Sequence, residues 1–199
     1  MRGERTELMP RISCSRDQEP VRLGKEADRA KKMVEEIELA HFLAAYNRAV
    51  EEDLQVLDSG ERPDFICVRS DGSLVGVELS KVVRDPQSAW AGEVFFHTDH
   101  MDPVQALLEV YYRISEKESK RQTPDWRLPD NTVLVIQNME CPLEEFCSEL
   151  EPPPDPHEFK EIWLADYSEL EAYGNIELFC LHPDRLWGYY ESVRGKPYG

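Results

Sequence analysis

A short polar turn between two apolar runs constrains this chain more than any other part of its sequence. Residues 65–69 (FICVR) and 74–82 (LVGVELSKV) are rich in Val, Ile and Leu, and only Ser-Asp-Gly with one further serine separates them. Two such runs joined by a short loop that contains glycine predict a β-hairpin. Both faces of the hairpin are largely apolar, which indicates a central strand pair covered on both sides.

The turn residues decide which side chains share a face of the hairpin. A two-residue turn at Asp71 and Gly72 would leave Asp64 and Glu78 on opposite faces of the sheet. A three-residue loop that ends at Gly72 would instead place Asp64 directly opposite Glu78. We expect the second register, because glycine accepts the positive φ that the last position of such a loop needs.

Two carboxylates that face each other need a compensating charge. Like charges in this position destabilise a hairpin, and burial increases the cost. A divalent cation bound between Asp64 and Glu78 would remove that cost. Alternatively, this end of the hairpin is open to water, and Arg62 or Lys81 neutralises it.

The remaining chain alternates between helical and strand-like segments. Residues 25–57 lack Gly and Pro and repeat apolar side chains at helical spacing, and Asp102-Pro103 begins a second helix that ends before Thr123-Pro124. Further strands are expected at residues 132–137, 162–165 and 176–181, and short helical segments at residues 142–150 and 168–173. This order predicts an α/β fold with a central mixed β-sheet flanked by helices.

The size and charge of the chain limit its organisation and its partners. Its 199 residues suit a flexible N-terminal arm, residues 1–22, and a single domain over residues 23–199. No apolar run is long enough to cross a membrane, and five cysteines without a CxxC motif favour a reducing cytoplasm. The net charge of −17 opposes binding to nucleic acid unless basic residues or bound cations reverse the field locally.

The stretch of residues 62–81 resembles the signature of the PD-(D/E)XK nuclease-like superfamily. That signature has Pro-Asp, a hairpin and then Glu-x-Lys, and here the Pro-Asp ends at Asp64 and the glutamate is Glu78. The resemblance implies a restriction endonuclease-like fold, in which Asp64, Glu78 and the Leu79 carbonyl would bind Mg²⁺ or Mn²⁺. It also implies hydrolysis of nucleic-acid phosphodiesters by metal-activated water.

The chain departs from this signature at the lysine. Besides the two carboxylates, the catalytic positions fall on Ser80, where the lysine would stand, and on Lys81, which points to the other face of the strand. Serine cannot supply a cation to stabilise developing charge. Three explanations stay open: Lys117 or Lys120 of the following helix reaches in, the site uses metal alone, or it does not cut.

Many members of the superfamily add a glutamate from the preceding helix. When residues 25–57 are projected as a helix, Glu36 lies inside the apolar stripe, whereas Glu35 and Glu38 point away. Glu36 is therefore the predicted additional metal ligand, with Glu51 as a weaker alternative. The other interpretation of Glu36 is a residue at the edge of the stripe that reaches water.

Four potential metal ligands precede the second helix: His97, Asp99, His100 and Asp102. Their spacing matches no recognised metal-binding motif. They could bind a metal near the hairpin, or they could form a polar loop in which Asp102 caps the helix.

Three functions are consistent with these features. The first is a Mg²⁺- or Mn²⁺-dependent nuclease acting on DNA or RNA. The second is a catalytically inactive nuclease-like fold whose acidic surface binds a protein partner, which Ser80 and the net charge favour. The third is an inhibitor that imitates nucleic acid. A nuclease should surround Asp64 and Glu78 with Arg and Lys, and a binding module should not.

Overall fold

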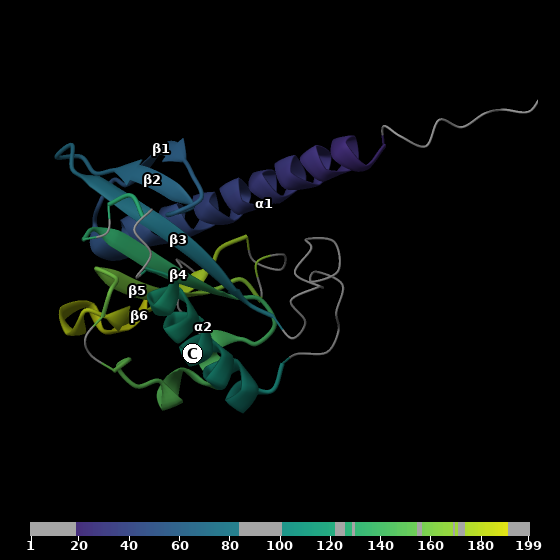
Figure 1. Ribbon diagram of the computed structural model, residues 1–199. Coiled ribbons are helices and arrows are strands. Elements are labelled where there is room, and N and C mark those ends of the chain that lie inside the picture. Colours follow the sequence, from purple (N-terminus) through teal and green to yellow (C-terminus); the bar gives the residue numbers. More distant parts are fainter. Residues whose placement is uncertain are drawn as a thin grey trace, which may run out of the picture.

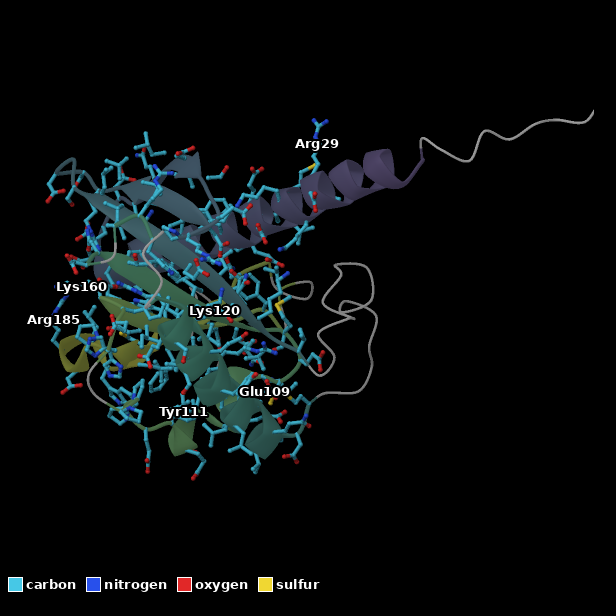
Figure 2. All side chains as sticks on the ribbon, viewed as in Figure 1. Arg29, Glu109, Tyr111, Lys120, Lys160 and Arg185 are labelled. Carbon is cyan, nitrogen blue, oxygen red and sulfur yellow. The ribbon has the colours of Figure 1, made fainter. Side chains whose placement is uncertain are left out.

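The computed structural model describes residues 19–83, 101–121, 126–128, 130–154, 157–168, 170 and 174–190, with side chains from residue 28 onward, as drawn in Figure 1 and Figure 2. A seven-stranded sheet forms the centre of the described chain, and the strands follow one another in sequence order. They are β1 (Gln55–Ser59), β2 (Phe65–Val68), β3 (Leu74–Val82), β4 (Thr132–Asn138), β5 (Glu161–Asp166), β6 (Glu177–His182) and β7 (Gly188–Tyr190).

The sheet is mixed, as the order of predicted elements indicated. Strands β3, β4 and β5 run parallel, and every other neighbouring pair is antiparallel. The parallel connection from β3 to β4 passes through a helix, as such crossovers usually do. The α/β prediction with a central mixed sheet flanked by helices is therefore confirmed. None of the described helices is long and apolar enough to cross a membrane.

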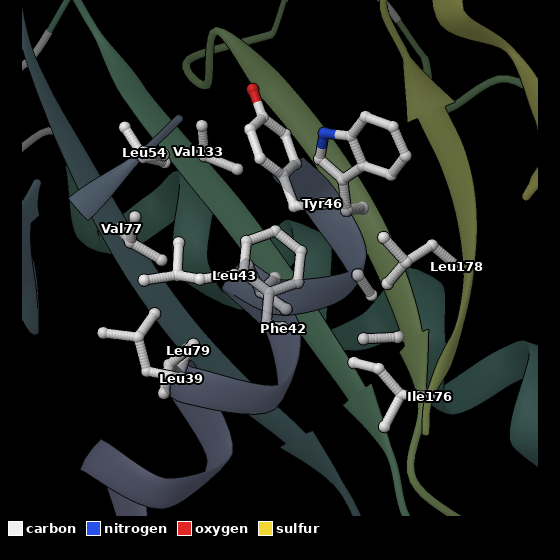
Figure 3. Packing of buried hydrophobic residues seen from close by; sticks show 14 of the residues in the cluster. Leu39, Phe42, Leu43, Tyr46, Leu54, Val77, Leu79, Val133, Ile176 and Leu178 are labelled. Atoms are coloured by element: carbon white, nitrogen blue, oxygen red, sulfur yellow. The ribbon is translucent and has the colours of Figure 1, made fainter. Parts of the chain in front are cut away.

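Two long helices cover opposite faces of the sheet (Figure 1). Helix α1 (Glu19–Val50) packs on one face, and α2 (Pro103–Arg121) packs on the other. Beneath α1, Phe42 and Tyr46 lie against the apolar side chains of β3 to β6, and Tyr46 makes an edge contact with Trp163 (Figure 3). The face under α2 is completed by two single 3-10 turns, at Leu143–Glu145 and Cys147–Glu149.

Helix α1 ends earlier than predicted, and this creates a strand that the sequence did not indicate. Glu51 takes a left-handed φ of 55° directly after the helix, and the Asn47 side chain then binds both backbone groups of Leu54, at 2.8 and 3.1 Å. Left-handed helix ends usually contain glycine, so Glu51 carried no such signal. Gln55–Ser59 consequently form the exposed strand β1 rather than the end of a helix.

The start of α1 also differs from the prediction. The helix begins at Glu19, so residues 19–22 of the expected arm belong to it, and residues 1–18 lie outside the described chain. The N-terminal half of α1 extends past the edge of the sheet (Figure 1). Met33 and Ile37 are apolar residues of the 25–57 pattern, but they are 56% and 58% exposed and do not belong to the buried face.

The predicted hairpin register is confirmed. The amide of Arg69 donates to the Ser73 carbonyl at 2.9 Å, and Gly72 closes the three-residue loop with a φ of +83°. Phe65 pairs with Val77, which brings the preceding residue, Asp64, opposite Glu78.

Gly76 lets the hairpin pack closely against the residues before it. A Cβ at this position would lie 2.7 Å from Pro63 Cγ and 2.8 Å from Thr132 Oγ1. Both distances are below van der Waals contact, and Pro63 directly precedes Asp64. We predict that Gly76→Ala lowers the free energy of unfolding by about 1–3 kcal/mol, measured by urea denaturation. Leu74→Ala, at the exposed start of the same strand, should cost less than Gly76→Ala, and equal costs would contradict this account.

Candidate functional site

Asp64 and Glu78 form the centre of the candidate site. The Asp64 amide donates to Glu78 Oε2 at 3.2 Å, and Asp64 Oδ2 accepts from the Leu79 amide at 2.8 Å. The segment that leads into β2 is also held to α1, because Lys32 Nζ donates to the carbonyls of Asp64 and Gly60 at 3.1 and 3.3 Å. The predicted pairing of the two carboxylate residues is thus present, and backbone groups hold it in place.

The pair lies where β3 loses its neighbouring strand. Strand β2 pairs with β3 only up to Val77, whereas β3 continues to Val82. In the described chain no strand pairs with residues 79–82 on this side. Backbone groups of β3 are therefore open toward this edge, which lies between α1 and α2.

A cleft of about 490 Å³ occupies this open edge. Helix α1 supplies one wall, β3 the floor and α2 the other wall. Its charged lining comprises five cations and two acids, namely Lys31, Lys81, Arg113, Lys117 and Lys120 with Glu35 and Glu116. The lining itself has more cations than acids, in a chain with a net charge of −17. Each of these cations is nevertheless paired with an acid, and Lys81 and Lys117 pair with acids that lie outside the lining.

The cation that compensates Glu78 comes from α2. Lys117 Nζ lies 2.5 Å from Glu78 Oε1, and the two side chains are only 15% and 6% exposed. Lys117 is one of the two helix lysines that were predicted as possible donors. Lys120, the other, lies on the cleft rim with an exposed side chain and pairs with Glu116 at 2.7 Å.

Asp64 keeps a proton more strongly than an ordinary aspartate. Burial, which has the largest effect, and the neighbouring charges of Glu78 and Glu35 together raise the pKa of Asp64 from 3.8 to about 7. The hydrogen bond from the Leu79 amide and the charge of Lys117 act in the opposite direction. A cation bound beside Asp64 would favour its ionised form, because opposite charge lowers a carboxyl pKa.

Ser80 and Lys81 lie on opposite faces of β3, as predicted. Ser80 is buried and lines the cleft. Lys81 points toward α1, where its Nζ lies 2.5 Å from Glu38 Oε1, and Gln137 Nε2 donates to the other oxygen of Glu38 at 3.3 Å. The alternative in which Lys81 neutralises the carboxylate pair is therefore wrong, since this lysine has its own buried acid.

The helical projection placed the α1 carboxylates incorrectly. Glu36 is exposed, whereas Glu35 lines the cleft and Glu38 is buried at 4% exposure. The projection failed because the exposed Met33 and Ile37 shifted the apparent stripe. Glu51 lies at the other end of α1 and lines a separate pocket. The site thus includes two acidic residues, Glu35 and Glu38, that the periodicity had excluded.

The polar cluster before α2 is described only in part. His97, Asp99 and His100 lie outside the described residues. Asp102 Oδ1 accepts from the amides of Val104 and Gln105 at 3.0 and 3.3 Å, so Asp102 caps α2.

The oxygen atoms at the hairpin suit a hard cation that binds only a few protein ligands. Among the described residues, no group of three His, Cys, Asp or Glu side chains is arranged to hold a metal ion. Mg²⁺, however, usually keeps several waters and binds through one or two carboxylates. Asp64, Glu78 and the Leu79 carbonyl therefore fit this ion by donor type.

We predict that Asp64→Asn removes a pH dependence of stability. Because the pKa of Asp64 is higher in the folded protein than its ordinary value, the folded state holds the extra proton between pH 3.8 and about 7. This group's contribution to stability is present at low pH and is lost as the pH rises through that window. Asp64→Asn should therefore be more stable than the parent above pH 7, by on the order of 2 kcal/mol.

The measurement is urea unfolding across this pH range. Asp58→Asn is the matched control, because the Asp58 side chain is 54% exposed and pairs with Arg127 on the surface. A parent and an Asp64→Asn variant with parallel stability curves would contradict the raised pKa of Asp64.

We predict that Lys117→Met destabilises the protein by about 3 kcal/mol, because it leaves the buried Glu78 without its cation. The double variant Lys117→Met/Glu78→Gln should recover more than half of this loss, since no unpaired charge remains. Lys120→Met, on the exposed rim, should cost less than about 1 kcal/mol. Additive losses in the double variant would show that the pair is not energetically coupled.

No protein-family model, no curated protein and no solved structure matches this chain. The candidate site therefore rests on its own geometry. Its elements are a carboxylate pair at an open strand edge, a lysine that enters from the next helix and a cleft lined mainly by cations.

Proposed function

We propose that this protein is a metal-dependent nuclease with a restriction endonuclease-like core. The observation that carries the proposal is the meeting of Asp64, Glu78 and Lys117 at the open edge of β3, beside a cleft that Lys117 lines together with other cations. A nuclease was expected to surround the two carboxylates with Arg and Lys, whereas a binding module was not. Arg113, Lys117 and Lys120 of α2 line the cleft in the way that the first function requires.

The order of the elements supports the same fold proposal. A helix precedes the β2–β3 hairpin, and a crossover helix leads from β3 to the parallel strand β4. This is the succession of helix, hairpin, helix and strand in a mixed sheet that the resemblance implies.

Asp64 and Glu78 would hold Mg²⁺ or Mn²⁺, with the Leu79 carbonyl as a further ligand. When bound, such an ion neutralises charge on a phosphodiester and lowers the pKa of a coordinated water. Asp64 has a pKa of about 7 without a cation, so metal and proton compete for it near neutral pH. Metal affinity should consequently rise with pH over this range.

Lys117 would take the place of the lysine that is missing at Ser80. It approaches Glu78 from α2 rather than from the strand, so the cation reaches the same carboxylate by a different route. In a cleft of restricted solvent access, an ammonium group stabilises the negative charge that develops during hydrolysis. Lys31 and Lys120, whose side chains are exposed, would contact phosphates and orient a strand without selecting its sequence.

We predict that the parent protein cleaves nucleic acid in low salt with Mn²⁺ and that Asp64→Asn and Glu78→Gln do not. The assay uses supercoiled plasmid and labelled single-stranded DNA and RNA. Lys117→Gln should retain metal binding but lose at least about tenfold in rate, as is usual when one group that stabilises transition-state charge is removed.

Arg127→Gln is the control, because Arg127 is exposed on the surface and lines none of these walls. Binding of Mn²⁺ is measured separately by calorimetry. Cleavage that survives both carboxylate substitutions would place the chemistry elsewhere and overturn the assignment.

A second function is favoured by the surface of β1. All five residues of this edge strand are exposed, and Val56 and Leu57 are 51% and 61% exposed. An exposed apolar strand at a sheet edge is a site where another protein chain can add a strand. If the parent neither cleaves nucleic acid nor binds Mn²⁺, the inactive protein-binding module becomes the better interpretation.

A further inference from the structure

A buried arginine at the end of α2 lacks partners for its charged donors. Arg121 is 8% exposed, and its Nε and Nη1 atoms have no hydrogen-bond partner in the structure. Its guanidinium instead stacks on Phe159 and Trp126, with ring-centroid distances of 4.7 and 5.5 Å. Unpaired buried donors on a charged group are costly, and a bound anion would remove that cost.

Arg121 lines a pocket of about 410 Å³ that is separate from the cleft at the open edge of β3. The pocket lies between the end of α2 and the segment that follows β6. Its titratable lining consists of Arg121, Lys160, Arg185, His157, His182, Asp130 and Glu158. Figure 2 shows Lys160 and Arg185 near each other at the same end of the molecule.

The charges of this pocket favour an anion. Its lining contains three permanent cations, two carboxylates and two imidazoles. The imidazoles of His157 and His182 contact each other at a centroid distance of 4.5 Å, and His157 Nδ1 lies 3.2 Å from Glu118 Oε1. No ion pair joins Arg121 to a carboxylate of the described residues, although the charges of Glu158, Asp130, Glu118 and Glu78 act on it from a longer distance. Its Nε and Nη1 groups therefore have no direct partner.

The ligand class follows from the donors. A guanidinium presents parallel N–H groups in a fixed plane, and this arrangement suits the oxygens of a phosphate. The aromatic rings on which Arg121 stacks hold that plane still, which reduces the entropy lost on binding. We propose that the pocket formed by Arg121, Lys160 and Arg185 binds a phosphate group.

Two sources could supply this group: the terminal phosphate of a nucleic-acid strand, or a free phosphate or small phosphate ester. The site does not depend on the nuclease proposal, since it shares no residue with the carboxylate pair. Lys120 lines the cleft and its neighbour Arg121 lines the pocket, so the last turn of α2 separates the two sites.

The test is calorimetric titration of the full chain with inorganic phosphate, against chloride at matched ionic strength. We expect saturable binding by the parent, with affinity reduced by at least about tenfold in Arg121→Gln and severalfold in Arg185→Gln. Arg127→Gln should bind like the parent. The proposal would be overturned if the parent shows no saturable binding. It would also be overturned if both Arg121→Gln and Arg185→Gln bind phosphate as tightly as the parent.

Arg121 is buried, so its variant requires a folding check by circular dichroism. If Arg121→Gln is unfolded, the double variant Lys160→Gln/Arg185→Gln decides, because both side chains are exposed and their loss should not prevent folding. Unchanged phosphate affinity in that folded double variant would overturn the proposal.

Oligonucleotides that carry a 5′-phosphate, a 3′-phosphate or only hydroxyl ends distinguish the two sources. Tighter binding of one phosphorylated end, lost in Arg185→Gln, would identify a strand terminus as the ligand. Equal binding of all three, with inorganic phosphate still bound, would identify a free phosphate or a small ester. These titrations use Asp64→Asn as the background, so that cleavage cannot alter the probes and the result is independent of nuclease activity.

Discussion

The juxtaposition of Asp64 and Glu78 is the constraint on which the site depends. The three-residue loop sets them opposite each other. They lie where β2 begins, beyond its last pairing with β3, and this leaves them at an open edge. Two acids held this closely require positive charge nearby. Lys117 meets that requirement, and the need to deliver its ammonium group ties the position of α2 to the hairpin.

Strand β3 connects to both helices through ion pairs of opposite polarity. On the face toward α2 the strand supplies the acid and the helix the base, in Glu78 and Lys117. On the face toward α1 the strand supplies the base and the helix the acid, in Lys81 and Glu38. Each pair is largely buried, so removal of one partner would leave the other as a buried charge without compensation. The two walls of the cleft are consequently fixed relative to the same strand.

The parts of the site that depend on local chemistry could be predicted from the sequence. The register of Asp64 and Glu78 followed from Gly72 alone, because loop length and backbone conformation determine it. The sequence could not select Lys117 over Lys120 as the cation at Glu78, since that choice depends on how α2 crosses the sheet. Periodicity could not select Glu35 and Glu38, because Met33 and Ile37 are apolar but exposed and shifted the apparent stripe. Strand β1 was missed because Glu51 ends the helix without a glycine.

The sequential order of the strands has a consequence for how the molecule assembles. Among the described strands, each pairs only with its neighbours in sequence order, so no pairing skips a strand, although β4 follows β3 only after helix α2. Such local connectivity reduces the loop-closure entropy that slows the folding of sheets. The residues lining the cleft at the open edge of β3 all lie between positions 30 and 137, whereas the pocket at Arg121 also needs residues 157–185. During synthesis from the N-terminus, the cleft can therefore form first and the pocket only after most of the chain has emerged.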